Sequence, residues 1–141
     1  MIRRFTFIAM ASILLMGCAS AVINTVMKIN TGEAKRFAKA VMRDEPIDFR
    51  KFSVSSDLKG YLKSDEGVAY YKTIRNETGA LKKLKLKSVK GTTSDTMNYR
   101  FIASFKENEA KREVRVQTYG DHRFINVFVT PWQDTMEPLE K

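Results

Sequence analysis

The sequence has few of the residues that build disulfides, metal centres and nucleophilic active sites. Its 141 residues include one cysteine, Cys18, and one histidine, His122. A lone cysteine excludes an intramolecular disulfide, and one cysteine with one histidine argues against a metal centre. No glycine-rich phosphate loop or serine elbow is present. We therefore expect no cofactor, no metal and no catalytic residues.

Positive charge and apolar residues are both plentiful. Lysine and arginine number 25 against 16 acidic residues, which gives a formal net charge of +9. The hydrophobic share is 43% and the aromatic share 11%, enough to build a packed core. The length is that of a single domain.

The N-terminus has the three parts of a secretory signal peptide. Arg3 and Arg4 form a positive start, residues 5–16 are almost all apolar, and small residues follow at 17–20. This order predicts export of the rest of the chain, with the two arginines left on the cytoplasmic side.

Residues 15–18 (LMGC) resemble the lipobox of bacterial lipoproteins. The resemblance implies that residues 1–17 are a cleaved lipoprotein signal peptide and that Cys18 becomes the acylated first residue of the mature chain. Met16 departs from the pattern, since a smaller or β-branched residue is commoner there. Ala19 replaces the aspartate typical of inner-membrane retention, so the resemblance implies a periplasm-facing lipoprotein of the outer membrane.

A plain membrane anchor is the alternative reading of the same segment. No charged residue occurs at positions 5–27, a run of 23 residues, and a membrane-spanning helix needs about 20 apolar residues. Under this reading the segment stays uncleaved and holds the protein in the inner membrane.

Three helices are predicted after a tether at residues 18–30. Asn30 and Glu33 resemble a capping box, and apolar residues at helical spacing predict a helix that ends before Pro46. Two shorter helices follow, the first capped by Ser55 or Ser56 and the second by Ser64 or Asp65, and Gly79 ends the second. Their predicted inward residues are Leu58, Tyr61 and Leu62 in the first, and Val68, Tyr71 and Ile74 in the second.

Alternating patterns then predict four strands with short turns. The clearest covers residues 97–106, where apolar and polar residues alternate. Helices followed by sequential strands predict an α+β fold at residues 31–131, with N-terminal helices packed on a curved antiparallel sheet of about four strands. Residues 132–141 are expected to form a tail. This order of elements resembles the nuclear-transport-factor-like and cystatin-like family of α+β cones.

A lysine-rich stretch within residues 81–90 is the most unusual local feature, and it contains Lys82, Lys83, Lys85, Lys87 and Lys90. One interpretation is a solvated strand face whose lysines also prevent edge-to-edge association. The other is a patch that binds anionic lipid, an anionic envelope polymer or an acidic envelope protein. Export argues against nucleic acid as the partner.

His122 is expected in a solvated hairpin turn, next to Asp121, with no catalytic role. The favoured function is therefore a membrane-anchored, non-enzymatic binding or assembly module of the cell envelope, attached through lipidated Cys18. A carrier of a small apolar ligand in the cone is the alternative, and a cone-fold enzyme is the least favoured.

Overall fold

The computed structural model describes residues 30–92, 95–120 and 122–133. The predicted signal peptide, Cys18 and the tether up to residue 29 lie outside the described residues, as do residues 134–141 of the predicted tail. The chain divides into two compact units, Met1–Glu33 and Ala34–Lys141. Of the first unit only residues 30–33 are described, and they are helical.

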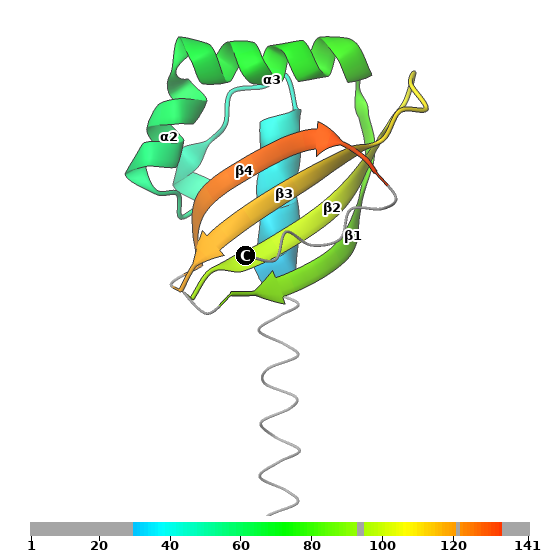
Figure 1. Cartoon of the computed structure of the whole chain (residues 1–141). Helices are drawn as coiled ribbons and strands as arrows, with labels where there is room; N and C mark the ends of the chain where they lie inside the picture. Colours follow the sequence, from blue (N-terminus) through cyan, green and yellow to red (C-terminus); the bar gives the residue numbers. More distant parts are fainter. Residues whose placement is uncertain (1–29, 93–94, 121, 134–141) are drawn as a thin grey trace, which may run out of the picture. The chain divides into compact units, whose positions relative to one another are not determined.

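The second unit has the predicted α+β architecture (Figure 1). The N-terminal helix covers residues 30–42, and its part in this unit, residues 34–42, lies against one face of the sheet. The elements that follow are η1 (Phe49–Lys51), α2 (Ser56–Lys63), α3 (Asp65–Thr78), β1 (Leu81–Gly91), β2 (Met97–Phe105), β3 (Arg112–Tyr119) and β4 (Arg123–Pro131). The four strands are antiparallel and lie in sequence order, so α3 leads directly into a meander.

The two short helices begin where the serines predict. The Ser55 hydroxyl accepts a hydrogen bond from the Leu58 amide at 3.3 Å, and the Ser64 hydroxyl accepts one from the Gly67 amide at 3.1 Å. These bonds satisfy amides that have no partner within the helix. Gly79 ends α3 at φ 73°, a conformation that glycine adopts without strain. The prediction for Asn30 was less accurate, because this residue is already helical.

The core fills the space between the N-terminal helix and the sheet. Phe37 of the helix stacks on Phe124 of β4 with ring centroids 4.3 Å apart and planes 10° apart. Phe101, Ala103 and Val114 of the central strands are fully buried beneath them. Burial on this scale contributes about 25 cal/mol per Å² of apolar surface, so this layer is the main source of stability.

Two tyrosines fasten α3 to β4. The Tyr71 hydroxyl donates to the Val127 carbonyl at 3.0 Å in a buried position, and burial raises the pKa of this phenol. The Tyr70 hydroxyl donates to the Val129 carbonyl at 2.9 Å nearer the surface. Successive residues of α3 thus reach the carbonyls of alternate residues on β4, which fixes the helix along the strand.

Two side chains predicted to face inward, Tyr61 and Val68, are exposed instead, and so is Leu86 of β1. Helical spacing brought Tyr61 and Val68 into the expected core stripe, but the inward contacts of α2 and α3 are made by their neighbours Leu58, Leu62, Tyr71 and Ile74. Leu86 pairs with Phe101 on the core side, yet it lies on an edge strand next to a break in register.

A candidate basic groove

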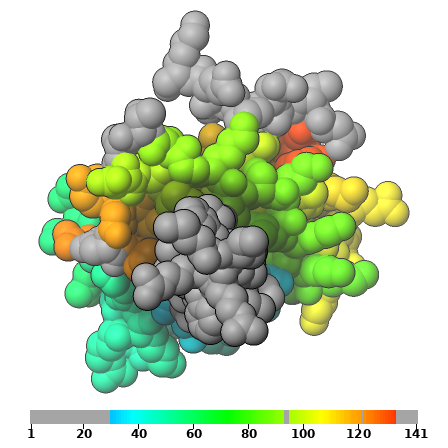
Figure 2. All heavy atoms as spheres, turned by 90° about the horizontal axis from the view of Figure 1, so that it is seen from below, coloured from blue at the N-terminus to red at the C-terminus, as the bar shows by residue number. Residues whose placement is uncertain are grey.

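The lysines of β1 do not form one patch. The sheet register pairs Lys83, Lys85 and Lys90 with β2 residues of the face that points away from the core. Lys82 and Lys87 fall at two register shifts of β1, where the extra residue interrupts the alternation. The space-filling view in Figure 2 shows side chains of β1, in green, over much of this side of the molecule.

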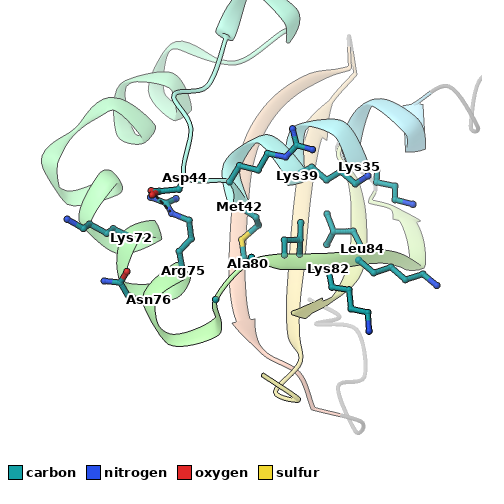
Figure 3. Close-up of a pocket in the computed structure, with 14 residues that line it drawn as sticks. Lys35, Lys39, Met42, Asp44, Lys72, Arg75, Asn76, Ala80, Lys82 and Leu84 are labelled. Carbon is teal, nitrogen blue, oxygen red and sulfur yellow. Dashed lines mark ion pairs between the residues drawn. The ribbon is translucent and has the colours of Figure 1, made fainter. Parts of the chain in front are cut away.

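Lys82 and Lys83 line a cavity of about 570 Å³, whereas Lys85, Lys87 and Lys90 do not. We call this cavity the basic groove (Figure 3). The N-terminal helix, the C-terminal half of α3 and the start of β1 surround it. Its lining residues are Lys35, Lys39, Met42, Arg43, Asp44, Lys72, Arg75, Asn76, Gly79, Ala80, Leu81, Lys82, Lys83 and Leu84.

Helical spacing aligns the cations that come from outside β1. Lys35 and Lys39 are four residues apart on one face of the N-terminal helix, and Arg43 follows directly after its end. Lys72 and Arg75 are three residues apart on α3 and face the same cavity. The close-up shows the ends of Lys72 and Lys82 directed outward at the rim. These helical cations were missed from the sequence, although their spacing was a usable signal.

The charge of the groove is strongly one-sided. Seven of the lining residues are cationic, although the register places the Lys83 side chain on the other face of the sheet, and Asp44 is the only acidic residue among them. Buried Met42 and Leu84 form part of the floor. A concave surface that carries one sign of charge concentrates the electric field and attracts ions of the opposite sign. The groove therefore has the chemistry of an anion-binding site with a partly apolar base.

Arg75 and Asp44 meet at one end of the groove. The Arg75 Nε lies 3.3 Å from an Asp44 oxygen but makes no hydrogen bond of good geometry. The Arg75 Nη1 donates to the Val41 carbonyl at 3.5 Å, a long contact. Because the Asp44 side chain is 90% exposed, water weakens this ion pair. The Asp44–Arg75 contact is thus a weak ion pair at this end of the groove.

A second cavity, the apolar groove, has a volume of about 410 Å³ and lies between the end of the N-terminal helix, η1, α2 and α3. Its walls include the apolar side chains of Val41, Ile47, Phe49, Leu62, Val68 and Tyr71. Arg43, Asp44 and Arg75 line this groove as well as the basic groove. The two cavities are therefore neighbours with a shared wall.

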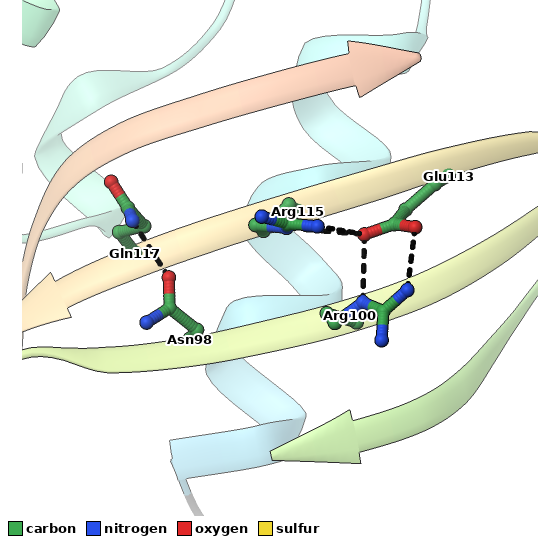
Figure 4. A network of polar contacts seen from close by, with 5 residues as sticks. All are labelled: Asn98, Arg100, Glu113, Arg115 and Gln117. Atoms are coloured by element: carbon green, nitrogen blue, oxygen red, sulfur yellow. Dashed lines mark hydrogen bonds and ion pairs between the residues drawn. The ribbon is translucent and has the colours of Figure 1, made fainter. Parts of the chain in front are cut away.

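The outer face of the sheet carries a closed ionic network (Figure 4). Arg100 donates two hydrogen bonds of 2.8 Å to the two carboxylate oxygens of Glu113, and Arg115 donates to one of the same oxygens at 2.8 Å. The Arg100 hydrogen bonds, supported by Arg115, lower the pKa of Glu113 although burial opposes them. Nearby, Gln117 donates to Asn98 at 2.7 Å. Because the Glu113 carboxylate accepts hydrogen bonds from both arginines, the network stabilises the pairing of β2 with β3.

The candidate imidazole of the sequence lies at the surface. His122 is exposed in the turn between β3 and β4, with φ 62°, as the sequence predicted. Across residues 30–92, 95–120 and 122–133, no three His, Cys, Asp or Glu side chains are grouped to hold a metal ion. In the same part of the chain, no helix combines the length and apolarity needed to cross a membrane.

Comparison with protein-family models, with curated proteins and with solved structures gave no match for this chain.

Proposed function

We propose that this protein is a membrane-anchored, non-enzymatic binding module of the cell envelope whose basic groove holds an anionic partner. The observation that carries the proposal is that seven cationic residues and a single carboxylate, from three separate parts of the chain, line one cavity. A solvated strand face would explain lysines along β1, but it would not explain lysines of two helices that line the same cavity.

Electrostatics sets the expected strength and conditions of binding. Each lysine near an anionic surface contributes roughly 1 kcal/mol. Several acting together give useful affinity at low ionic strength. Exposed charges are screened over about 8 Å at physiological salt, so binding through the groove weakens as salt is added.

The predicted anchor favours a partner at the membrane surface. A lipid on Cys18, followed by the tether at residues 18–30, would hold the domain within about 45 Å of the bilayer even if the tether were fully extended. Tethering raises the effective concentration of the groove towards anything on that surface. A modest affinity is then sufficient for function.

The anchor is tested by replacing its cysteine. We expect Cys18→Ser to abolish metabolic labelling with a radioactive fatty acid and to leave the unprocessed precursor. An unchanged mature mass in this variant would rule out lipoprotein processing and leave the uncleaved inner-membrane anchor.

The groove is tested with a soluble polyanion, dextran sulfate, added to the full chain in neutral-detergent micelles. Lys72 and Lys82 are exposed at the rim, so the double variant Lys72→Gln with Lys82→Gln should fold normally and bind more weakly. Lys106→Gln with Lys111→Gln removes the same charge from the exposed β2–β3 turn and is the matched control. Equal loss in both pairs would mean that overall charge, and not the groove, attracts the polyanion.

The second candidate function is to carry a small apolar ligand, and the presence of the apolar groove supports this function. The interior between the N-terminal helix and the sheet is filled by fully buried side chains such as Phe37 and Phe101. A carried ligand would therefore occupy the apolar groove and not the centre of the cone.

A further inference from the structure

The Asp44–Arg75 ion pair stands between two grooves of different chemistry. On one side the basic groove offers seven cations in about 570 Å³, and on the other the apolar groove offers aliphatic and aromatic walls in about 410 Å³. Both volumes fall in the range of small-molecule sites. Because Arg43, Asp44 and Arg75 line both cavities, the two lie next to each other.

The apolar groove is built from side chains that leave hydrophobic surface open to solvent. Val68, on the groove side of α3, is 50% exposed. Tyr71 has its hydroxyl bound to the Val127 carbonyl, so the polar end of this side chain is already satisfied. Phe49 is only partly buried, although Lys59 and Lys63 place their ammonium groups 5.7 and 5.4 Å from its ring centre. These walls match a hydrocarbon chain better than a polar ligand.

We propose that the two grooves form one binding site for a phosphorylated lipid. The anionic headgroup lies among the lysines of the basic groove, and one acyl chain passes the Asp44–Arg75 pair into the apolar groove. This inference rests on the proposed function and deepens it by naming the class of ligand.

The Asp44–Arg75 ion pair lies where the headgroup and the acyl chain of such a lipid would meet, and its Asp44 side chain is exposed. The Arg75 guanidinium matches the geometry of phosphate oxygens, which it can bind through two parallel hydrogen bonds. Its contact with exposed Asp44 is weak, so a phosphate group can replace the carboxylate. An acidic polymer would use the cations and leave the apolar groove empty, whereas a neutral apolar ligand would do the reverse. Only an anionic amphiphile uses both.

The test is photo-cross-linking of the full chain in neutral-detergent micelles. The probe is phosphatidic acid with a diazirine at the end of one acyl chain, and phosphatidylcholine with the same chain is the headgroup control. Labelled peptides are identified by mass spectrometry. We expect phosphatidic acid to label residues 46–49 and 62–71 about tenfold more than phosphatidylcholine does, because the headgroup selects the site.

Two variants locate the chain and the headgroup separately. Val68→Asp places a charge in the path of the chain and should reduce labelling of these peptides about tenfold. Phe128→Asp makes the same kind of change at an exposed aromatic residue of β4, outside both grooves, and should leave labelling unchanged. Lys72→Gln with Lys82→Gln should reduce labelling by phosphatidic acid alone.

The outcomes separate this inference from the proposed function. Equal labelling by both lipids, or labelling that Val68→Asp does not reduce, overturns the lipid site. If the binding of dextran sulfate still depends on the groove lysines, the proposed anion-binding function is retained without the lipid site. If replacement of those lysines also leaves the binding of dextran sulfate unchanged, both the proposed function and the lipid site are ruled out.

Discussion

Arg100 of β2 lies directly opposite Arg115 of β3 in the register of the sheet. Two like charges in this position repel each other and destabilise a strand pair. Glu113, two residues before Arg115 on β3, accepts hydrogen bonds from both guanidinium groups and is itself only 1% exposed. One buried carboxylate therefore turns a repulsive pair into an attractive network of three charges.

Removal of that carboxylate charge should destabilise the fold strongly. We expect Glu113→Gln to lower the free energy of unfolding by about 3 kcal/mol, because two guanidinium groups are left facing each other with little access to water. Urea unfolding of the full chain, followed by circular dichroism, measures the loss. Glu109→Gln, in the exposed turn between β2 and β3, is the control and should change stability by less than about 0.5 kcal/mol. A similar small effect at Glu113 would show that the network contributes little.

The same network predicts how stability changes with pH. Its two arginines hold the pKa of Glu113 below the usual value of 4.5, so the folded state releases this proton more readily than the unfolded state does. The resulting stability is fully present above pH 4.5 and is lost as the pH falls through the lower pKa of the folded protein. The stability difference between wild type and Glu113→Gln should therefore stay constant from pH 7 to about pH 5 and shrink below about pH 4. A difference that grew on acidification would contradict the assignment.

Two glycines of the short helices should respond in opposite ways to alanine. A Cβ at Gly67 would overlap the carbonyl of Tyr61, where α3 starts close to the end of α2. Gly60 has open space around it within α2. We expect Gly67→Ala to cost about 2 kcal/mol or more, while Gly60→Ala should add about 0.5 to 1 kcal/mol through better helix propensity. Thermal unfolding distinguishes them, and equal shifts would argue against a tight approach at Gly67.

The local structure of this chain was largely predictable because it depends on neighbouring residues. Ser55, Ser64 and Gly79 delimit α2 and α3, and alternation identified β2 and β3. The exposure of Val68 was not predictable in the same way. Helical spacing places Val68 in the stripe of Tyr71 and Ile74, but which part of that stripe is covered depends on where the N-terminal helix and α2 end.

The candidate site was only partly predictable, because segments far apart in the sequence create it. Lys82 and Lys83 stood out in a dense run of lysines, and the structure brings them together with Lys35 and Lys39 of the N-terminal helix. Lys87 is separated from this group because it lies four residues further along β1 than Lys83. Its ammonium group lies instead 5.9 Å from the ring centre of Trp132.

The tyrosines that fasten α3 to β4 should differ in their effect on stability. Tyr71→Phe removes a hydrogen bond in a buried position, so we expect a loss of about 1 to 2 kcal/mol. Tyr70 is 40% exposed, so water can replace its bond to Val129 and Tyr70→Phe should cost less than about 0.5 kcal/mol. Denaturant unfolding compares the pair. An equal loss in the two variants would mean that water does not reach the Val129 carbonyl.

The structure predicts that the lysines of β1 are not equivalent in anion binding. Lys82 and Lys83 line the basic groove, whereas Lys87 and Lys90 belong to the same strand but lie outside it. We expect Lys82→Gln with Lys83→Gln to weaken binding of dextran sulfate several-fold more than Lys87→Gln with Lys90→Gln, although each pair removes the same charge. Titrations at low and physiological salt compare the variants, and the difference should narrow as salt rises because exposed charges are screened. If both pairs reduce binding equally at low salt, the strand attracts anions along its whole length, and the groove formed with the two helices adds nothing.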